Sequence, residues 1–141
     1  NIDETGRMEE AYTFLDTDVF LTPKDVREVQ LAKSAIRTGI ELMCKKRGVS
    51  PEDIRHVYLA GAFGNYLDPV SACRIGMIPA CLADRISGIG NAAGQGAILS
   101  ALREDEFAYS QSLAKQAEFL ELASIPEFND CYMDYLLFEE E

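Results

Sequence analysis

The feature that most constrains this chain is an apolar run that stops at two glycines, in Arg55-His56-Val57-Tyr58-Leu59-Ala60-Gly61-Ala62-Phe63-Gly64-Asn65. Residues 54–60 predict a buried strand, because short runs rich in Val, Ile and Tyr are typical of β structure. Glycine is needed after a strand where a side chain would collide with a bound molecule, or where φ is positive. The segment therefore predicts a strand that presents a backbone turn. Both a ligand-binding role and a purely structural role for the turn remain open.

A second glycine-rich segment, Gly90-Asn91-Ala92-Ala93-Gly94-Gln95-Gly96-Ala97, follows another predicted strand and opens a helix. Unpaired N–H groups at the start of a helix attract phosphate. The spacing matches neither the dinucleotide-binding fingerprint nor the P-loop. Small residues also let a helix approach a neighbour closely, so phosphate binding and close packing are both open. Together the two glycine segments predict one side of a nucleotide site.

A long amphipathic helix is predicted before the first glycine segment. Thr22-Pro23-Lys24-Asp25 provides a hydroxyl N-cap, a proline at the first helical position and an acid at the third. The helix should run to about Arg47 and end at Gly48. Its apolar residues recur at intervals of three and four: Val29, Ala32, Ile36, Ile40 and Met43.

Shorter elements are predicted around this helix. Residues 12–21 suit two short strands or a hairpin, and residues 51–53 a single helical turn. Further helices are expected over 69–75, 79–85, 92–102, 105–116 and 126–137, and further strands over 86–89 and 118–122. Strands that alternate with helices imply an α/β fold with parallel pairing. We expect residues 1–11 to be a linker or frayed terminus and residues 12–141 to form one domain.

Composition excludes several classes of function. The 13 basic and 24 acidic residues give a net charge of −11, which would repel a nucleic acid backbone. No apolar stretch approaches the roughly 20 residues that span a bilayer, and no signal peptide is visible. The four cysteines form no C-x-x-C pair, so the sequence predicts reduced thiols in a cytoplasmic protein and no zinc or iron–sulfur site. Because the first residue is Asn, we expect the chain to be a piece of a longer protein.

Two cations lie one turn apart on the long predicted helix. Lys33 and Arg37 suit a solvated helix face, and the alternative is that they reach over the base or ribose of a nucleotide held by the Gly61 turn. The chain has one histidine, which leaves few arrangements for an activated nucleophile. The residues themselves therefore predict no catalytic group.

Three segments in the same order resemble one family: residues 21–33 (LTPKDVREVQLAK), 57–69 (VYLAGAFGNYLDP) and 90–97 (GNAAGQGA). The family is the C-terminal region of the reductive activators of corrinoid proteins and of related ferredoxin-like proteins. The resemblance covers about residues 12–138. It implies one lobe of an actin-like, ribonuclease H-like ATPase fold, as in sugar kinases and heat-shock chaperones, with a mixed sheet and flanking helices.

The resemblance also implies a function. Such proteins use ATP, with Mg²⁺, to drive reduction of cob(II)alamin to cob(I)alamin in the corrinoid protein of a methyltransferase system. The electron comes through an iron–sulfur domain outside this part of the chain. Residues 61–65 match the adenosine motif, and the helix from Asn91 matches the second connecting motif. The nucleotide-binding residues expected on these grounds are Gly61, Ala62, Phe63, Gly64, Asn65, Gly90, Asn91 and Gly94, with Lys33 and Arg37 flanking.

The chain departs from the superfamily pattern in two ways. The Asp-x-Gly-Thr phosphate loop has no match, because Asp3-Glu4-Thr5-Gly6 has the wrong order, and the ferredoxin cysteines are absent. The chain is therefore expected to be one lobe, inactive alone and without catalytic or metal-binding residues. The alternatives are a sugar-kinase-like phosphotransferase lobe and an interaction module with a vestigial nucleotide site. The oligomeric state is open, a homo-oligomer included.

Overall fold

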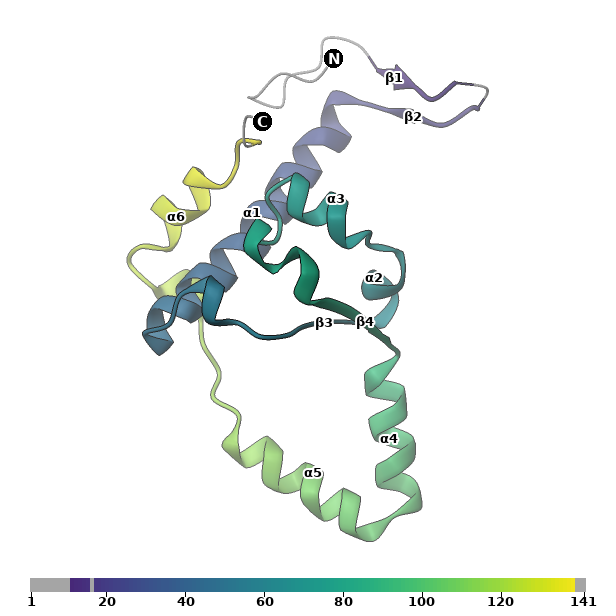
Figure 1. The fold of residues 1–141 in the computed structure, drawn as a ribbon, viewed down its shortest axis with the longest axis vertical. Coiled ribbons are helices and arrows are strands. Elements are labelled where there is room, and N and C mark those ends of the chain that lie inside the picture. The colour runs from purple at the N-terminus through teal and green to yellow at the C-terminus, as the bar shows by residue number, and fades with distance from the viewer. Residues whose placement is uncertain (1–10, 16, 139–141) are drawn as a thin grey trace.

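A computed structural model describes residues 11–15 and 17–138, and Figure 1 shows the order of its elements. A long helix, α1 (Pro23–Arg47), follows a small hairpin of β1 (Tyr12–Thr13) and β2 (Phe20–Leu21). The later elements are η1 (Pro51–Asp53), β3 (Val57–Ala60), α2 (Gly61–Tyr66), α3 (Pro69–Arg74), η2 (Ala80–Arg85), β4 (Ile86–Gly90), α4 (Ala92–Leu102), α5 (Glu104–Gln116), η3 (Leu122–Ser124) and α6 (Phe128–Asp134).

Helix α1 begins and ends where the sequence predicts. The Asp25 N–H donates to the Thr22 hydroxyl at 3.2 Å, and the Thr22 N–H donates to the Asp25 carboxylate at 2.8 Å. This capping box satisfies two N–H groups at the helix start. Gly48 ends the helix with φ 66°, a conformation that residues with a Cβ adopt at a cost.

The two longest strands, β3 and β4, form a parallel pair, as the alternation of strands and helices predicts. The observed strand is shorter and more exposed than the buried strand predicted over 54–60. Strand β3 begins only at Val57, and Tyr58 is 61% exposed. The residues before β3 are hydrogen-bonded to a side chain instead of to a strand. The Arg85 guanidinium donates to the carbonyls of Glu52 and Ile54, both at 2.6 Å, so the Ile54 carbonyl lies outside the strand ladder.

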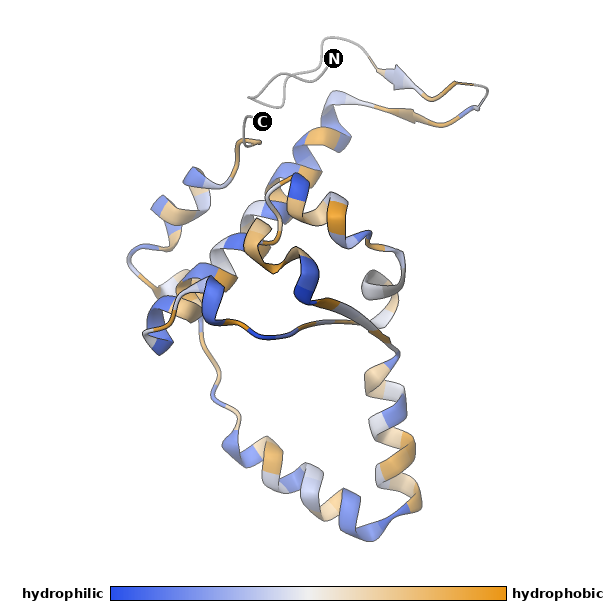
Figure 2. Cartoon of the chain, in the orientation of Figure 1, coloured by the Kyte–Doolittle hydropathy of each residue, from blue (hydrophilic) through white to orange (hydrophobic). Residues whose placement is uncertain are grey.

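The hydrophobic core is small and lies between the parallel strands and the helical turns that join them. Its buried members are Ala72, Cys73, Met77, Ile78 and Leu82, against which Val57, Leu59 and Ile86 also pack. The Asp68 carboxylate caps α3, the helix predicted from residue 69, by accepting from the Ser71 N–H at 2.8 Å. Figure 2 shows hydrophobic colouring in α3, η2 and the two strands, at the centre of the molecule.

Helix α1 buries a polar face. Gln30, Lys33, Ser34 and Thr38 are each 0–1% exposed. The C-terminal segment covers this face: α6 runs along α1 (Figure 1), and the Ser34 hydroxyl donates to the Tyr132 carbonyl. The apolar stripe of α1 lies on the other side of the helix, and much of it is exposed.

Two of the predicted elements differ from the structure after residue 116. The predicted strand at 118–122 is wrong: those residues are irregular up to η3. A strand needs a neighbour for its backbone hydrogen bonds, and none of the described strands pairs with this segment. The last helix is shorter than the predicted 126–137, since α6 spans only Phe128–Asp134.

Helices α4 and α5 match their predicted ranges within a residue and form an arm that leaves the body (Figure 1). Neither helix has a buried residue. The chain returns near the end of α1, where the Lys46 Nζ lies 2.7 Å from a Glu118 carboxylate oxygen. The close packing that the small residues of α4 would permit is therefore absent among the described residues.

Candidate nucleotide site at the carboxyl ends of the parallel strands

The fold brings the two glycine segments together. Because β3 and β4 are parallel, their carboxyl ends lie at the same edge of the sheet, and Ala60 pairs directly with Gly90. Gly61 and Asn91 follow immediately, and α2 packs on both strands. In open α/β sheets ligands bind beyond the carboxyl ends of the strands. This edge is therefore the candidate site.

Gly61 is required by its backbone conformation. Its φ is 75°, and a Cβ there would meet nothing within 4 Å. Gly90 is similar, with φ 60° and open space beside it. Bare backbone with open space on its outer side allows close approach of a ligand. Both alternatives that the sequence left open, positive φ and room for a ligand, are compatible with Gly61.

Position 64 requires glycine for packing and not for a positive φ. A Cβ at Gly64 would lie 2.4 Å from the Leu59 carbonyl oxygen, which is far inside van der Waals contact. The predicted turn at residues 61–65 is wrong in detail, because residues 61–66 form the short helix α2. That helix lies directly against β3, so the glycine at position 64 allows α2 to pack on its own strand.

Asn91 caps helix α4. Its side-chain oxygen accepts from the Gly94 N–H at 2.9 Å and satisfies one of the free N–H groups of the helix start. Gly94 is closely packed against this cap, since a Cβ there would lie 2.5 Å from the Asn91 amide nitrogen. This capping role differs from both roles that the sequence left open for the segment, phosphate binding and close packing of the helix.

Lys33 and Arg37 lie against the C-terminal segment. The Lys33 Nζ is 5.5 Å from the ring centre of Phe138, and the Arg37 guanidinium carbon is 4.8 Å from that of Tyr135. Arg37 also pairs with Glu41 at 2.9 Å. Burial raises the pKa of Tyr135, and the Glu41 carboxylate adds to that shift. Neither cation is on a solvated face, and their contact with a nucleotide stays a prediction.

The remaining predicted site residues are only partly described. Ala62 is exposed. The side chains of Phe63 and Asn65 lie outside the described part of the structure, so their roles stay predictions. The sequence analysis missed Arg85, whose guanidinium joins the segment before β3 to the start of β4. No local pattern marks this arginine, because its carbonyl partners lie about thirty residues earlier in the chain.

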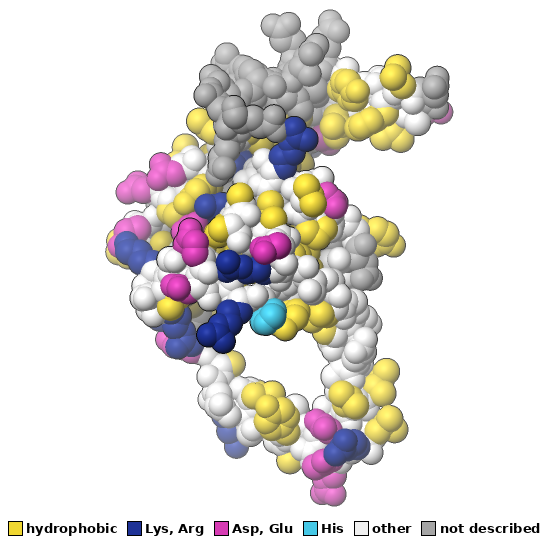
Figure 3. Space-filling view, in the orientation of Figure 1, with side chains coloured by type: hydrophobic (Ala, Val, Ile, Leu, Met, Phe, Trp, Pro, Cys, Tyr) yellow, Lys and Arg dark blue, Asp and Glu magenta, His cyan; other side chains and the backbone are white. Residues whose placement is uncertain are grey.

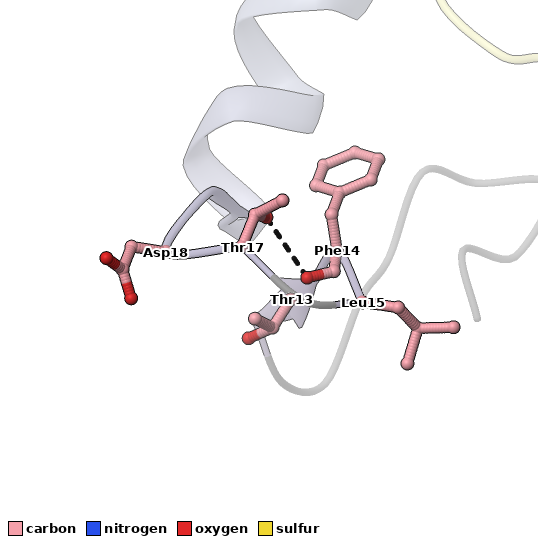
Figure 4. A pocket seen from close by; sticks show the side chains of 5 residues that line it. All are labelled: Thr13, Phe14, Leu15, Thr17 and Asp18. Carbon is pink, nitrogen blue, oxygen red and sulfur yellow. Dashed lines mark hydrogen bonds between the residues drawn. The ribbon is translucent and has the colours of Figure 1, made fainter.

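Two hollows lie elsewhere. One, of about 440 Å³, is at the β1–β2 hairpin, where the labelled side chains point in different directions and the Thr17 hydroxyl donates to the Phe14 carbonyl at 3.1 Å (Figure 4). The other, of about 330 Å³, lies between the end of α1 and the start of β3. Neither is lined by the two glycine segments.

Two of the four cysteines, Cys44 and Cys73, are buried. Burial raises the pKa of the Cys44 and Cys73 thiols, which disfavours the reactive thiolate. Residues 11–15 and 17–138 contain no group of three or more His, Cys, Asp or Glu side chains placed to hold a metal ion. No helix within these residues is long and apolar enough to cross a membrane.

A family model for the C-terminal domain of RACo, described as the ASKHA domain, matches residues 4–141. The chain belongs to this family. ASKHA denotes the actin-like, sugar-kinase-like and heat-shock-chaperone-like ATPase superfamily, so the fold class and the family predicted from three sequence segments are both confirmed.

Two curated relatives agree with this assignment. The chain is 40% identical over 121 residues to the corrinoid activation enzyme RamQ of Eubacterium limosum, covering 86% of this chain and 20% of the relative. It is 29% identical over 137 residues to the [Co(II) methylated amine-specific corrinoid protein] reductase of Methanosarcina barkeri, covering 94% and 25%. The chain thus spans a quarter or less of each relative's length.

A solved structure has the same fold. The reductive activator for corrinoid, iron–sulfur protein superposes with a TM-score of 0.84 at 25% sequence identity, covering 97% of this chain and 25% of that one. This chain therefore corresponds to one part of a much larger protein in each comparison.

Proposed function

We propose that this chain is the nucleotide-binding lobe of an iron–sulfur protein that uses ATP to drive reductive activation of corrinoid proteins, from cob(II) to cob(I). The observation that carries the proposal is the meeting of the two glycine segments, at Ala60 and Gly90, beyond the parallel strands. Two further parts of the proposal, the corrinoid protein as partner and reduction as the reaction, are taken from the names of the relatives.

The candidate site fits the adenosine half of ATP. Gly61 and Gly90 present backbone with no atom within 4 Å of the Cβ position, which leaves room for a base or ribose beside the main chain. Segments 61–66 and 90–94 contain no carboxylate. Residues outside this chain would therefore hold Mg²⁺, and ATP hydrolysis would supply the free energy for an otherwise unfavourable electron transfer.

The residues of this chain would bind and orient the adenosine. The open backbone at Gly61 and Gly90 would accept adenosine between α2 and the start of α4, and Asn91 would keep the first turn of α4 in place. Closure of this lobe on the rest of the protein would couple nucleotide binding to docking of the corrinoid protein. The electron would come from an iron–sulfur cluster outside this chain, in a cytoplasmic protein.

The test is ATP binding by the full-length protein, measured by isothermal titration calorimetry, with two matched glycine variants. Gly61→Val and Gly48→Val both place a side chain at positive φ with open space around it, so their backbone strain is comparable. Only Gly61 borders the candidate site. We expect Gly61→Val to weaken ATP binding at least tenfold and Gly48→Val to leave the affinity unchanged.

The outcomes separate the alternatives. Equal affinities for the two variants would show that ATP does not bind at Gly61. If Gly61→Val abolishes ATP binding while reductive activation persists, the nucleotide site is vestigial and the domain is an interaction module. Residues 1–141 alone should show no ATP turnover, and measurable turnover would overturn the one-lobe interpretation.

A further inference from the structure

Helix α1 buries polar side chains on the face where an apolar surface is expected. Gln30, Ser34 and Thr38 are each 0–1% exposed, and Lys33 is 1% exposed. Burying polar groups costs free energy unless each of them is hydrogen-bonded. The Thr38 hydroxyl has no hydrogen-bond partner among the described residues. The contact that covers this face therefore adds less stability than an apolar contact would.

The cover is the C-terminal segment, residues 122–138. The Ser34 hydroxyl donates to the Tyr132 carbonyl, and the Tyr132 hydroxyl donates to a carbonyl of α1 at 3.3 Å. Leu122, at the start of the segment, lies against Gly39, where a Cβ would be 3.4 Å from the Leu122 Cδ1. Because these contacts are with α1 and not with β3 or β4, the segment can detach without breaking the parallel pair.

Aromatic rings of the segment lie over the two cations of this face. The Lys33 Nζ is 5.5 Å from the ring centre of Phe138, and the Arg37 guanidinium carbon is 4.8 Å from that of Tyr135. Detachment of the segment would remove both rings and uncover two positive charges on a chain whose net charge is −11. A local positive site on such a surface attracts anionic groups.

The segment that occupies the face shows which kind of ligand the face accepts. Residues 122–138 contain three carboxylates, no basic residue, and aromatic residues three or four positions apart: Glu127, Asp130 and Asp134, then Phe128, Tyr132, Tyr135 and Phe138. The Glu127 carboxylate lies 2.7 Å from the Lys45 Nζ of α1. Figure 3 shows acidic side chains over α6, with basic ones beside them toward the end of α1. The face therefore fits an acidic, aromatic helix.

We propose that the C-terminal segment is an autoinhibitory cover: it detaches from α1 as one unit while the core stays folded, and the uncovered face, with Lys33 and Arg37, binds an acidic, aromatic helix of a partner protein in its place. Segments with few buried contacts open at a lower free energy than the whole domain. The partner helix binds only the open state, so its apparent affinity is reduced by the fraction of molecules that are open. This inference does not rest on nucleotide binding.

Lysine acetylation of the full-length protein measures detachment, because Lys33 reacts with an N-hydroxysuccinimide ester only when it is uncovered. Lys24, exposed in the first turn of the same helix, is the reference. Helix α6 has no buried residue and Leu136 after it is 6% exposed, so Leu136→Ala removes a buried contact of the segment. We expect this variant to acetylate Lys33 at least tenfold faster than the wild type, with the Lys24 rate unchanged.

Hydrogen exchange of β3 and β4 in the same samples separates detachment from unfolding. If the segment detaches alone, Leu136→Ala leaves the exchange rates of both strands unchanged. A Lys33 rate that does not rise, or that rises by the same factor as the exchange of the strands, would overturn the proposal.

A synthetic peptide with the sequence of residues 122–138 tests the chemistry of the partner. Added in excess to the full-length Leu136→Ala protein, it should slow acetylation of Lys33 at least fivefold. A matched peptide with Glu127→Gln, Asp130→Asn and Asp134→Asn keeps the aromatic residues and should protect Lys33 at least threefold less. No protection by the first peptide, or equal protection by both, would contradict a surface for acidic helices.

Discussion

Gly64 shows how one residue determines the position of the candidate site. Because position 64 has no side chain, α2 can lie directly against β3, whereas a Cβ there would be 2.4 Å from the Leu59 carbonyl oxygen. Helix α2 begins at the positive-φ residue Gly61. Any displacement of α2 from β3 would therefore move the backbone that is proposed to contact adenosine. Gly64 acts on the site through packing, and Gly61 acts through its own conformation.

We predict that Gly64→Ala destabilises β3 and α2 by about 1–3 kcal/mol, the usual cost of forcing atoms into a packed region. Gly96→Ala is the control, because a Cβ at Gly96 meets nothing within 4 Å and alanine favours the helix. Native-state hydrogen exchange of the full-length protein measures the opening free energy of both strands. Equal effects of the two substitutions would show that the α2–β3 contact is not tight.

At the residue scale the sequence predicts conformations better than contacts. The caps at Thr22, Asp68 and Asn91 and the stop at Gly48 depend on neighbours within four positions, and all were predicted to lie at helix boundaries. The cation–aromatic contact of Arg37 with Tyr135 joins residues nearly a hundred positions apart. No local pattern contains that information, so a solvated or nucleotide-facing cation was the natural expectation.

At the scale of elements, the C-terminal segment around α6 contains an exposed ion pair and a buried leucine, which we expect to contribute unequally to its stability. Lys45 and Glu127 form an ion pair at 2.7 Å, but both side chains are more than half exposed. Leu136, just after α6, is only 6% exposed. Exposed ion pairs contribute little because water and salt screen them, whereas a buried leucine contributes both transfer free energy and packing.

We therefore predict that Leu136→Ala loosens the C-terminal segment by about 2–5 kcal/mol, and that Lys45→Gln costs less than about 1 kcal/mol. Hydrogen exchange of the α6 amides in the full-length protein provides the measurement. If Lys45→Gln had the larger effect, electrostatics would dominate the docking of α6, and that effect would shrink with added salt.

Element boundaries with strong caps were predictable, and elements that depend on a partner were not. Helices α1, α3, α4 and α5 each lie within a residue or two of the predicted range. The segment at 118–122 has apolar residues suited to a strand, but none of the described strands pairs with it. The apolar stripe of α1 was recognised correctly as periodic, but periodicity cannot say which molecule or segment covers it.

At the scale of the whole molecule, the chain consists of a small packed centre and a poorly supported periphery. The core around Ala72 and Leu82 joins β3, β4, α3 and η2. The α4–α5 arm contributes no buried residue, although Leu102 and Phe107 are apolar and 76% and 53% exposed. Helical stability in proteins comes mainly from packing of an apolar face, so such an arm has little of its own.

The expected consequence is uneven hydrogen exchange in residues 1–141 taken alone. Amides of α4 and α5 should exchange at least a hundredfold faster than those of β3, β4 and α3, because their opening breaks no buried contact. Mass spectrometry of exchanged, pepsin-digested protein resolves these segments. Equal protection of the arm and the core would mean that the arm is stable without further partners.

The clamp made by Arg85 has a consequence for the nucleotide edge, although it lies at the other end of the strands. By holding the carbonyls of Glu52 and Ile54, this guanidinium sets how far β3 is shifted along β4. From this start the pairing runs in register to Leu59 and Gly88, and an irregularity between Leu59 and Ala60 then brings Ala60 opposite Gly90. A slip of one position would move Gly90 away from Ala60 and separate the two backbone segments that are proposed to contact adenosine. The alignment of the proposed binding edge would thus depend on an arginine at the opposite end of the two strands.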